Sequence, residues 1–275
     1  MFIDTKTLFL AALASIGIGV GHAEADLIAH YTFDTDNAGT TPDEVGPNVA
    51  TLGSQVQINT TVAGRIGGGA LEMLGEPGSG NVGGPSSGAV TSNSFDWTND
   101  ARTLSFWWKI DPQASQANNG TYVSFGDNSE NGSRFDVKRL SSSALRVEVQ
   151  GAGANSSPAI DDGEWHFIAV VVPNDAFFND ILWFVDGGAD ISVDQNVVEL
   201  VTGSGPLAFG DSISTDTTFP RVPNGFLDDV QLYDEALTTE QIAFLYANPG
   251  SVIPEPGSLA LLGVGGLFVL RRRRS

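Results

Sequence analysis

GFLDDVQLYDEAL, residues 225–237, is the stretch that says most about the fold. Apolar and polar residues alternate along it, and Asp228, Val230 and Leu232 fall at every second position. Successive side chains of a strand point to opposite faces, so this spacing predicts a strand with these three residues on its inward face. A carboxylate in such a place has to be paired or bound to a metal, because burying it alone is costly.

One short helix is expected directly after this strand. Thr238 and Gln241 have the spacing of a capping box, in which each side chain bonds to the backbone N–H of the other residue. Ile242, Leu245 and Tyr246 then share one face of a helix over residues 238–247. We expect this helix to pack against the edge of the β-structure.

The rest of the body is a series of short strands with glycine-rich turns. Residues 104–110 alternate with period two, and Asp186-Gly187 predicts a hairpin turn between residues 181–185 and 191–193. The other strands that we expect cover residues 27–33, 70–73, 122–126, 134–138, 145–149, 165–172, 207–210 and 226–233. The pattern predicts an all-β protein, an antiparallel sandwich or jelly roll.

Both ends of the chain carry targeting signals. Lys6 precedes an apolar stretch over residues 8–20, and Ala23-Glu24-Ala25 is a cleavage site of the A-x-A type. Residues 1–25 are therefore expected to be a secretory signal peptide with a signal helix, which leaves Asp26 as the mature N-terminus. The prediction places the protein outside the cytoplasm.

The C-terminal segment has the layout of a membrane stop signal. An apolar run over residues 257–270 would be ~21 Å long as a helix, which is short of the ~30 Å hydrocarbon core. A plain tail anchor is the alternative. The residues resemble the PEP-CTERM sorting signal of Gram-negative, exopolysaccharide-producing bacteria, through Pro254, Glu255 and Pro256 and the terminal Arg271, Arg272, Arg273 and Arg274.

That resemblance implies how the protein is exported and processed, and it does not indicate a reaction or a ligand. It implies an exosortase and the secretion machinery as partners, and a transmembrane sorting helix that anchors the chain in the inner membrane for a time. Cleavage near Pro254-Glu255-Pro256 would release the protein to the cell surface or extracellular matrix. We expect a signal peptide over residues 1–25, one domain over residues 26–250 and the sorting segment over residues 251–275.

The net charge and the lack of cysteine exclude several classes of function. The chain carries a net charge of −20, and removal of both targeting ends takes away five basic and three acidic residues, which leaves −22. So acidic a body repels nucleic acid and anionic lipid. The chain has no cysteine, so thiol catalysis, thiolate metal sites and disulfides are excluded.

Several blocks resemble LamG-like domains of the concanavalin A-like lectin/glucanase type. In chain order these are LIAHYTFD at 27–34, GRIGGGAL at 64–71, TLSFWW at 103–108, GEWH at 163–166, FVDG at 184–187, and GFLDDV with YDEAL at 225–237. The resemblance covers residues 27–247 and implies a two-sheet antiparallel jelly-roll sandwich. Ligand-binding residues cannot be carried over, because such domains place their ligand sites in variable loops or on the concave sheet.

The resemblance also implies a structural Ca²⁺ between the first loop and the last strand. Hard oxygen ligands suit this ion, and Asp34, Asp43 and Asp228 are the candidates, helped by backbone carbonyls. The alternative is that Asp228 caps or bridges a backbone turn without an ion.

Signals for an enzyme are weak. The glucanase branch uses E-x-D-x-x-E on one strand, and this string is absent from the sequence. A carboxylate pair that forms only in three dimensions stays open as an alternative. His30 and His166 remain after processing and are expected to be packed or hydrogen-bonded strand residues. They give no recognisable zinc site.

The aromatic residues allow a binding function. Trp97, Trp107, Trp165, Trp183, Phe177 and Phe178 are candidates for a sugar-stacking platform. Trp107 is the first candidate because it alternates away from Phe106 and Trp108, with packing in a core as the favoured alternative. We predict an exported, non-catalytic binding or matrix protein that contacts polysaccharide. The alternatives are a glycan-cleaving enzyme and a purely structural matrix protein.

Overall fold

The computed structural model describes residues 25–62, 64–75, 87–97, 101–110, 120–140, 144–160, 162–190, 197–213 and 222–253. The expected signal peptide up to residue 24, Pro254, Glu255, Pro256 and Arg271 to Arg274 lie outside the described residues. Among the helices that are described, none is long and apolar enough to cross a membrane.

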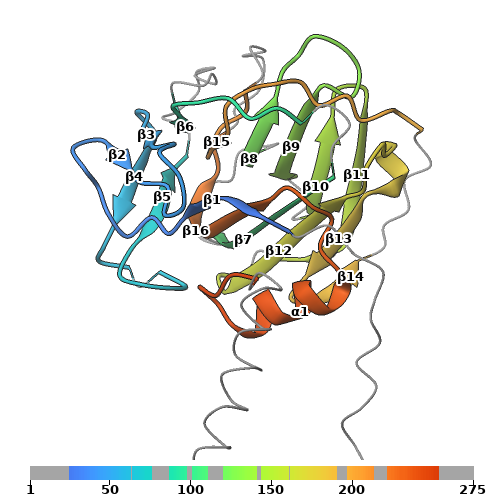
Figure 1. Cartoon of the computed structure of the whole chain (residues 1–275). Coiled ribbons are helices and arrows are strands. Elements are labelled where there is room, and N and C mark those ends of the chain that lie inside the picture. The colour runs from blue at the N-terminus through green and yellow to red at the C-terminus, as the bar shows by residue number, and fades with distance from the viewer. Residues whose placement is uncertain are drawn as a thin grey trace, which may run out of the picture.

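Two antiparallel sheets make up the body, as predicted (Figure 1). The first sheet contains, in spatial order, β14 (Gly188–Asp190), β13 (Leu182–Val185), β12 (Trp165–Val172), β7 (Arg102–Ile110), β16 (Asn224–Tyr233), β5 (Ala70–Leu74) and β4 (Val56–Asn59), with β1 (Leu27–Tyr31) paired to β16. The second contains β11 (Ala152–Ala159), β10 (Ala144–Val149), β9 (Arg134–Arg139), β8 (Gly120–Gly126), β15 (Ala208–Phe209), β6 (Ala89–Thr91), β3 (Ala50–Thr51) and β2 (Thr40–Thr41). Consecutive strands pair in β12–β14 and β8–β11, whereas β7–β16, β16–β5 and β8–β15 join strands that are far apart in sequence, as in a jelly roll.

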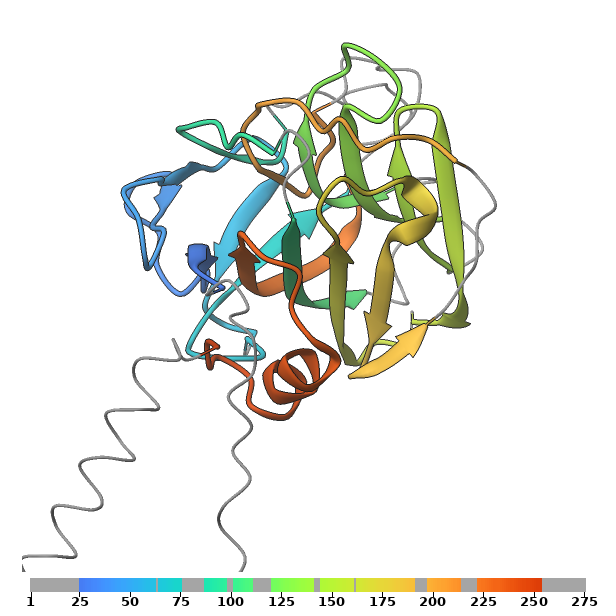
Figure 2. The ribbon, with the colours of Figure 1, turned by 45° about the vertical axis from the view of Figure 1, so that its right-hand side comes forward.

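The main core lies between the two sheets. The first sheet contributes Phe106, Trp108, Val230 and Leu232, all buried, and the second sheet faces them with residues such as Phe125. A second apolar cluster lies on the outer side of the first sheet, where Trp107, Phe167 and Tyr233 pack beneath helix α1 (Thr239–Ala247). Figure 2 shows α1 below the strands of this sheet.

The capping box and the hairpin turn that the sequence predicts are both formed. The capping box of α1 is formed, since the Gln241 N–H donates to Thr238 Oγ1 and the Thr238 N–H donates to Gln241 Oε1. Asp186 and Gly187 have φ of 50° and 75°, as a two-residue turn of the type I′ kind requires. The returning strand is β14, at residues 188–190, and so begins three residues earlier than predicted.

The prediction for Asp228 was wrong about its face. The register of β16 against β7 shifts between Asp228 and Gln231, and Asp229 has a left-handed φ of 49°. This β-bulge puts Asp228 opposite Trp107, on the outer side of the sheet, whereas Val230 and Leu232 face the main core. Asp228 is completely buried there, beneath the loop of residues 64–69.

Candidate ligand-binding cleft

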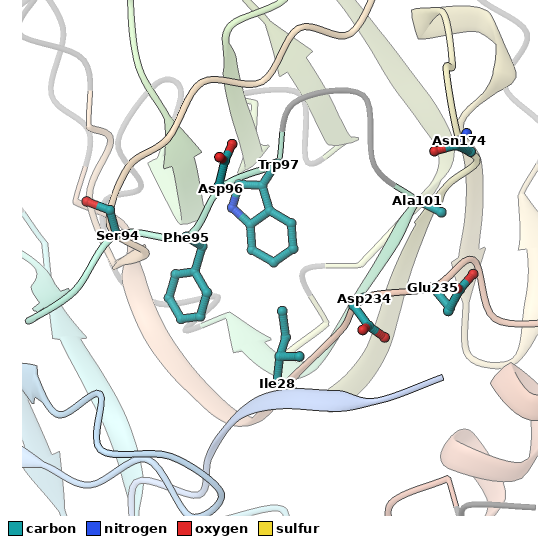
Figure 3. Close-up of a pocket in the computed structure, with 9 residues that line it drawn as sticks. All are labelled: Ile28, Ser94, Phe95, Asp96, Trp97, Ala101, Asn174, Asp234 and Glu235. Carbon is teal, nitrogen blue, oxygen red and sulfur yellow. The ribbon is translucent and has the colours of Figure 1, made fainter. Parts of the chain in front are cut away.

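A cleft of about 600 Å³ opens at one end of the sandwich. Five segments line it: Ile28 of β1, residues 94–97, Ala101 before β7, Asn174 after β12, and Asp234 with Glu235 after β16. Figure 3 shows the rings of Phe95 and Trp97 on one side and the carboxylates of Asp234 and Glu235 on the other. The polar residues Asn174, Asp234 and Glu235 follow β12 and β16, so the ends of these strands set their positions.

Phe95 and Trp97 form the aromatic side of the cleft. Their rings are stacked, with centroids 5.5 Å apart and an angle of 20° between the planes. Backbone hydrogen bonds in both directions between Phe95 and Gly205, at 2.8 and 3.0 Å, hold this segment against the second sheet. Trp97 is only 2% exposed, whereas Phe95 is partly exposed, so Phe95 offers its ring to the cleft and Trp97 supports it.

The opposite side is polar. Asn174 and Asp234 are exposed, and Glu235 is partly exposed. The hydroxyl of Thr103 donates to the backbone carbonyl of Glu235 at 2.8 Å and fixes the turn after β16. An aromatic face opposite a few hydrogen-bonding groups is the usual composition of a small-ligand site. Carboxylates and an amide offer acceptors for the hydroxyl groups of a sugar.

The three predicted calcium ligands lie in different local settings. Within the described part of the chain, no three His, Cys, Asp or Glu residues gather in a way that could hold a metal ion. Asp34 and Asp228 both accept backbone N–H groups of the 64–69 loop. Asp34 Oδ1 accepts from Gly68 and Gly69 at 2.6 and 2.8 Å. This loop requires glycine at residue 67, where φ is 57° and a Cβ would collide with the Asp34 carboxylate.

Asp228 holds the same loop from the other end. Its Oδ2 accepts the Ile66 N–H at 2.9 Å, and its Oδ1 accepts the Asp229 N–H at 2.7 Å. Burial raises the pKa of Asp228 to about 8, and the backbone amides oppose that rise. This arrangement is the one that we gave as the alternative to an ion, a carboxylate that bridges a backbone turn.

Among the three predicted calcium ligands, Asp43 has a carboxylate oxygen that accepts no hydrogen bond. Asp43 Oδ1 accepts the N–H groups of His30 and Val45, at 2.9 and 3.1 Å. Its Oδ2 is buried and has no hydrogen-bond partner. A buried carboxylate oxygen without a donor is the kind of group that a cation satisfies, so of the three candidates Asp43 is the one that leaves an oxygen for the expected Ca²⁺.

Trp107 packs in a core instead of forming a platform. It is 1% exposed, stacks with Tyr246 at 5.8 Å and lies beneath the guanidinium of Arg65, 4.1 Å from the ring centroid. The favoured alternative for this residue is confirmed. Trp97 was one of several aromatic candidates in the sequence, whereas Phe95 was not among them. The FDW triplet at residues 95–97 was the available signal, since it places two aromatic residues two positions apart.

The two histidines are hydrogen-bonded strand residues, as predicted. His30 Nε2 lies 2.8 Å from Asp229 Oδ1. His166 lies between two carboxylates, with Nδ1 2.8 Å from Asp186 and Nε2 3.0 Å from Asp162. The hydrogen bond with Asp186 raises the pKa of His166 to about 9, with burial opposing and Asp162 adding to the rise.

A carboxylate pair does form in three dimensions. Asp136 of β9 and Glu148 of β10 are cross-strand partners, and the ammonium of Lys138 bridges them at 3.2 and 2.8 Å. Arg134 also contacts both, and Arg146 contacts Glu148 at 2.7 Å. Burial alone would raise the pKa of Glu148, but Lys138 and Arg146 lower it to about 2. Glu148 is thus held ionised, whereas a general acid needs a raised pKa.

Comparison with known proteins gives two family matches. The model of the concanavalin A-like lectin/glucanases superfamily matches residues 83–243, and the PEP-CTERM protein-sorting motif matches residues 252–274. The second match bears out the resemblance of the C-terminal segment and indicates export to the cell envelope or surface, with processing by an exosortase. No curated protein matches the sequence.

Similar solved structures include enzymes and binding domains. Domain 4 of AbnA, an extracellular arabinanase from Geobacillus stearothermophilus in complex with arabinotriose, is 18% identical with a TM-score of 0.55, over 81% of this chain and 99% of that one. Trypanosoma rangeli sialidase is 14% identical with a TM-score of 0.56, over 80% of this chain and 32% of that one. The binding domain of Botulinum neurotoxin serotype G is 15% identical with a TM-score of 0.55, over 81% and 51%. At these identities the likeness shows the fold alone, and this chain spans about a third of the sialidase and half of the neurotoxin domain.

Proposed function

Because the chain belongs to the concanavalin A-like lectin/glucanases superfamily, we propose that it is an exported, non-catalytic binding protein of the cell surface or extracellular matrix. Its ligand is a carbohydrate, bound in the cleft beside Phe95. The observation that carries this proposal is the partly exposed Phe95 ring, supported by Trp97 and faced by Asp234 and Glu235 across an open space.

The chemistry of the cleft favours a neutral or cationic sugar. Phe95 offers an apolar surface for the C–H face of a sugar ring, and Asn174, Asp234 and Glu235 offer acceptors for its hydroxyl groups. An anionic polysaccharide would meet carboxylates at the cleft and a strongly acidic body beyond it. Ca²⁺ at Asp43 is part of the proposal as a structural ion, away from the sugar.

Binding is favoured over hydrolysis by the state of the carboxylates. Asp136 and Glu148 are each paired with basic side chains, and the low pKa of Glu148 leaves no proton to donate to a leaving group near neutral pH. The cross-strand pair therefore stabilises the second sheet in this proposal. Incubation with candidate glycans and measurement of reducing ends tests the enzyme alternative directly.

The test of binding compares two aromatic substitutions on a glycan array. Phe95→Ala removes the ring from the cleft, and Phe177→Ala removes an exposed ring that does not line it. We expect Phe95→Ala to weaken binding about tenfold or more, as loss of an aromatic anchor does, with Phe177→Ala unchanged. Equal affinities for wild type and both variants, or no glycan bound by wild type, would refute the proposal.

A further inference from the structure

Hydrogen bonds and packing fix the chain to the domain as far as Ile253, the residue before Pro254 of the sorting motif. The Gly250 N–H donates to Asp229 Oδ2 at 2.9 Å, and the side-chain amide of Gln231 donates to the Ser251 carbonyl at 3.0 Å. The Ile253 N–H donates to the Tyr233 hydroxyl at 3.2 Å. Ile253 also packs against the second apolar cluster. No free linker separates the domain from Pro254.

The expected N-terminal cleavage site lies at the same cluster. Ala25 packs against it, as do Leu27 of β1 and Ile253. Strand β1 pairs antiparallel with β16, and Leu27 lies opposite Tyr233. The positions at which the signal peptide and the sorting segment join the domain are therefore on one side of the molecule, the side that carries α1 in Figures 1 and 2.

A short tether follows from this geometry. Only residues 254–256 separate Ile253 from the apolar run that begins at residue 257. Three residues span ~10 Å at full extension. While the apolar run is in a membrane, the surface around Ile253 has to stay within about that distance of it.

The segment that leads to Ile253 carries no charge. Residues 241–253 contain no charged residue, in a chain whose net charge is −20. Phe244, Tyr246 and Val252 are 39%, 38% and 38% exposed, although they are large hydrophobic residues. We call this surface the junction face and define it by Arg65, Ile66, Phe244, Tyr246 and Val252.

Two further contacts join these residues into one surface. A Cβ at Gly250 would lie 3.3 Å from Ile66, so the 64–69 loop adjoins the segment that leads to the sorting motif. Tyr246 and Arg65 both pack on Trp107. Arg65 is exposed and brings one cation to the junction face.

We propose that the domain rests on a lipid bilayer through the junction face for as long as the sorting segment is in the membrane. Aromatic residues are favoured at the membrane–water interface, and Arg65 suits a lipid phosphate. The residues that define the junction face include one cation, Arg65, and no acidic side chain, which lets this acidic protein approach a membrane that the rest of its surface would repel. After cleavage the tether is gone, and the domain leaves the membrane.

The chain has no cysteine, which allows a direct test with single labelled positions. Phe244→Cys places a fluorophore on the junction face, and Ser129→Cys places it in the turn between β8 and β9, at the opposite end of the molecule from α1 in Figure 1. The chain from Asp26 to Ser275 is reconstituted in protein-free vesicles of phosphatidylethanolamine and phosphatidylglycerol. Lipids with a nitroxide headgroup then quench probes that lie at the membrane surface.

We expect several-fold stronger quenching at residue 244 than at residue 129, and equal, weak quenching at both in the chain that ends at Ile253. Val252→Cys gives a second junction-face probe if Phe244→Cys alters the melting temperature. Equal quenching at all positions of the tailed chain would overturn the proposal. A second contrary outcome is a change in the probe at residue 244 only when an exosortase is added to the vesicles. The junction face would then bind a protein and not the lipid.

Discussion

Asp26 and Asp234 are joined by two hydrogen bonds at the rim of the cleft. The Asp26 N–H donates to Asp234 Oδ1 at 2.8 Å, and the Asp234 N–H donates to the Asp26 carbonyl at 3.2 Å. The second bond, between backbone groups, continues the β1–β16 ladder beyond the pair of Leu27 and Tyr233. If the signal peptide is cleaved after Ala25, the donor at Asp26 becomes an ammonium group and the first bond becomes an ion pair.

Maturation should therefore add a weak electrostatic contact beside the cleft. In the mature chain we expect Asp234→Asn to lower the free energy of unfolding by about 0.2–1 kcal/mol, the range for exposed ion pairs. Chemical acetylation of the Asp26 amine should remove most of that difference. Urea unfolding of the four combinations gives the coupling energy. If acetylation leaves the effect of Asp234→Asn unchanged, the ammonium does not pair with Asp234.

His166 should make stability depend on pH in the alkaline range. Asp186 and Asp162 raise its pKa from 6.5 to about 9 in the folded protein. A raised folded-state pKa gives stability that is complete below pH 6.5 and is lost as the pH rises through about 9. Because the side chains of Asp186 and Asp162 are 37% and 59% exposed, we expect only about 1 kcal/mol.

The measurement compares wild type with His166→Gln. The difference in their free energy of unfolding should shrink between pH 6.5 and pH 9.5, and all other groups cancel in the comparison. NMR titration of the imidazole checks the pKa itself. A difference that stays constant over this range would mean that the folded protein does not raise the pKa of His166.

Local sequence patterns predicted what depends on neighbouring residues. The capping box at Thr238 and Gln241 and the turn at Asp186-Gly187 are formed as expected, because each uses groups within a few residues of one another. The ordered blocks from residue 27 to residue 237 pointed to the two-sheet fold for the same reason, since each block is one strand or turn. The β-bulge at Asp229 was missed, because the alternation rule assumes an unbroken pleat and a φ of 49° leaves no mark in the sequence.

The cleft could not be predicted for a different reason. Ile28, Asn174 and Asp234 come from separate segments that the pairing of β1, β7, β12 and β16 brings together, and Phe95 joins them through its bridge to Gly205. Trp107 shows the converse problem. Its alternation away from the main core was correctly inferred, but the sequence did not show that α1 covers that side of the sheet.

Asp228 should be a strong determinant of stability. Replacement by Ala leaves the partly buried N–H of Ile66 and the buried N–H of Asp229 without their acceptor, and each unsatisfied buried group costs about 1–3 kcal/mol. We therefore expect Asp228→Ala to lower the free energy of unfolding by at least about 2 kcal/mol. Asp36→Ala is the control, because exposed Asp36 accepts one N–H from Gly39, and we expect less than about 1 kcal/mol there.

The loss at Asp228 should also vary with pH. Its folded pKa of about 8 is raised from 3.8, so its contribution to stability is complete below pH 3.8 and falls as the pH rises to about 8. Urea unfolding at pH 5 and pH 9 should thus show a larger effect of Asp228→Ala at pH 5. An effect that grows with pH would show that the ionised carboxylate is the stabilising form, as it would be beside a bound cation.

Calcium can be tested at Asp43, where the structure leaves a buried carboxylate oxygen without a donor. If Ca²⁺ binds the folded protein there, its addition should raise the melting temperature, and EDTA should reverse the rise. Asp43→Asn should remove the response, because an amide is a weaker ligand for this ion than a carboxylate. Asp34→Asn should change stability through the Gly68 and Gly69 amides but keep the response, since Asp34 Oδ1 already accepts both. Equal melting temperatures in Ca²⁺ and EDTA would leave all three aspartates as acceptors for backbone amides, which is the role that their hydrogen bonds already show.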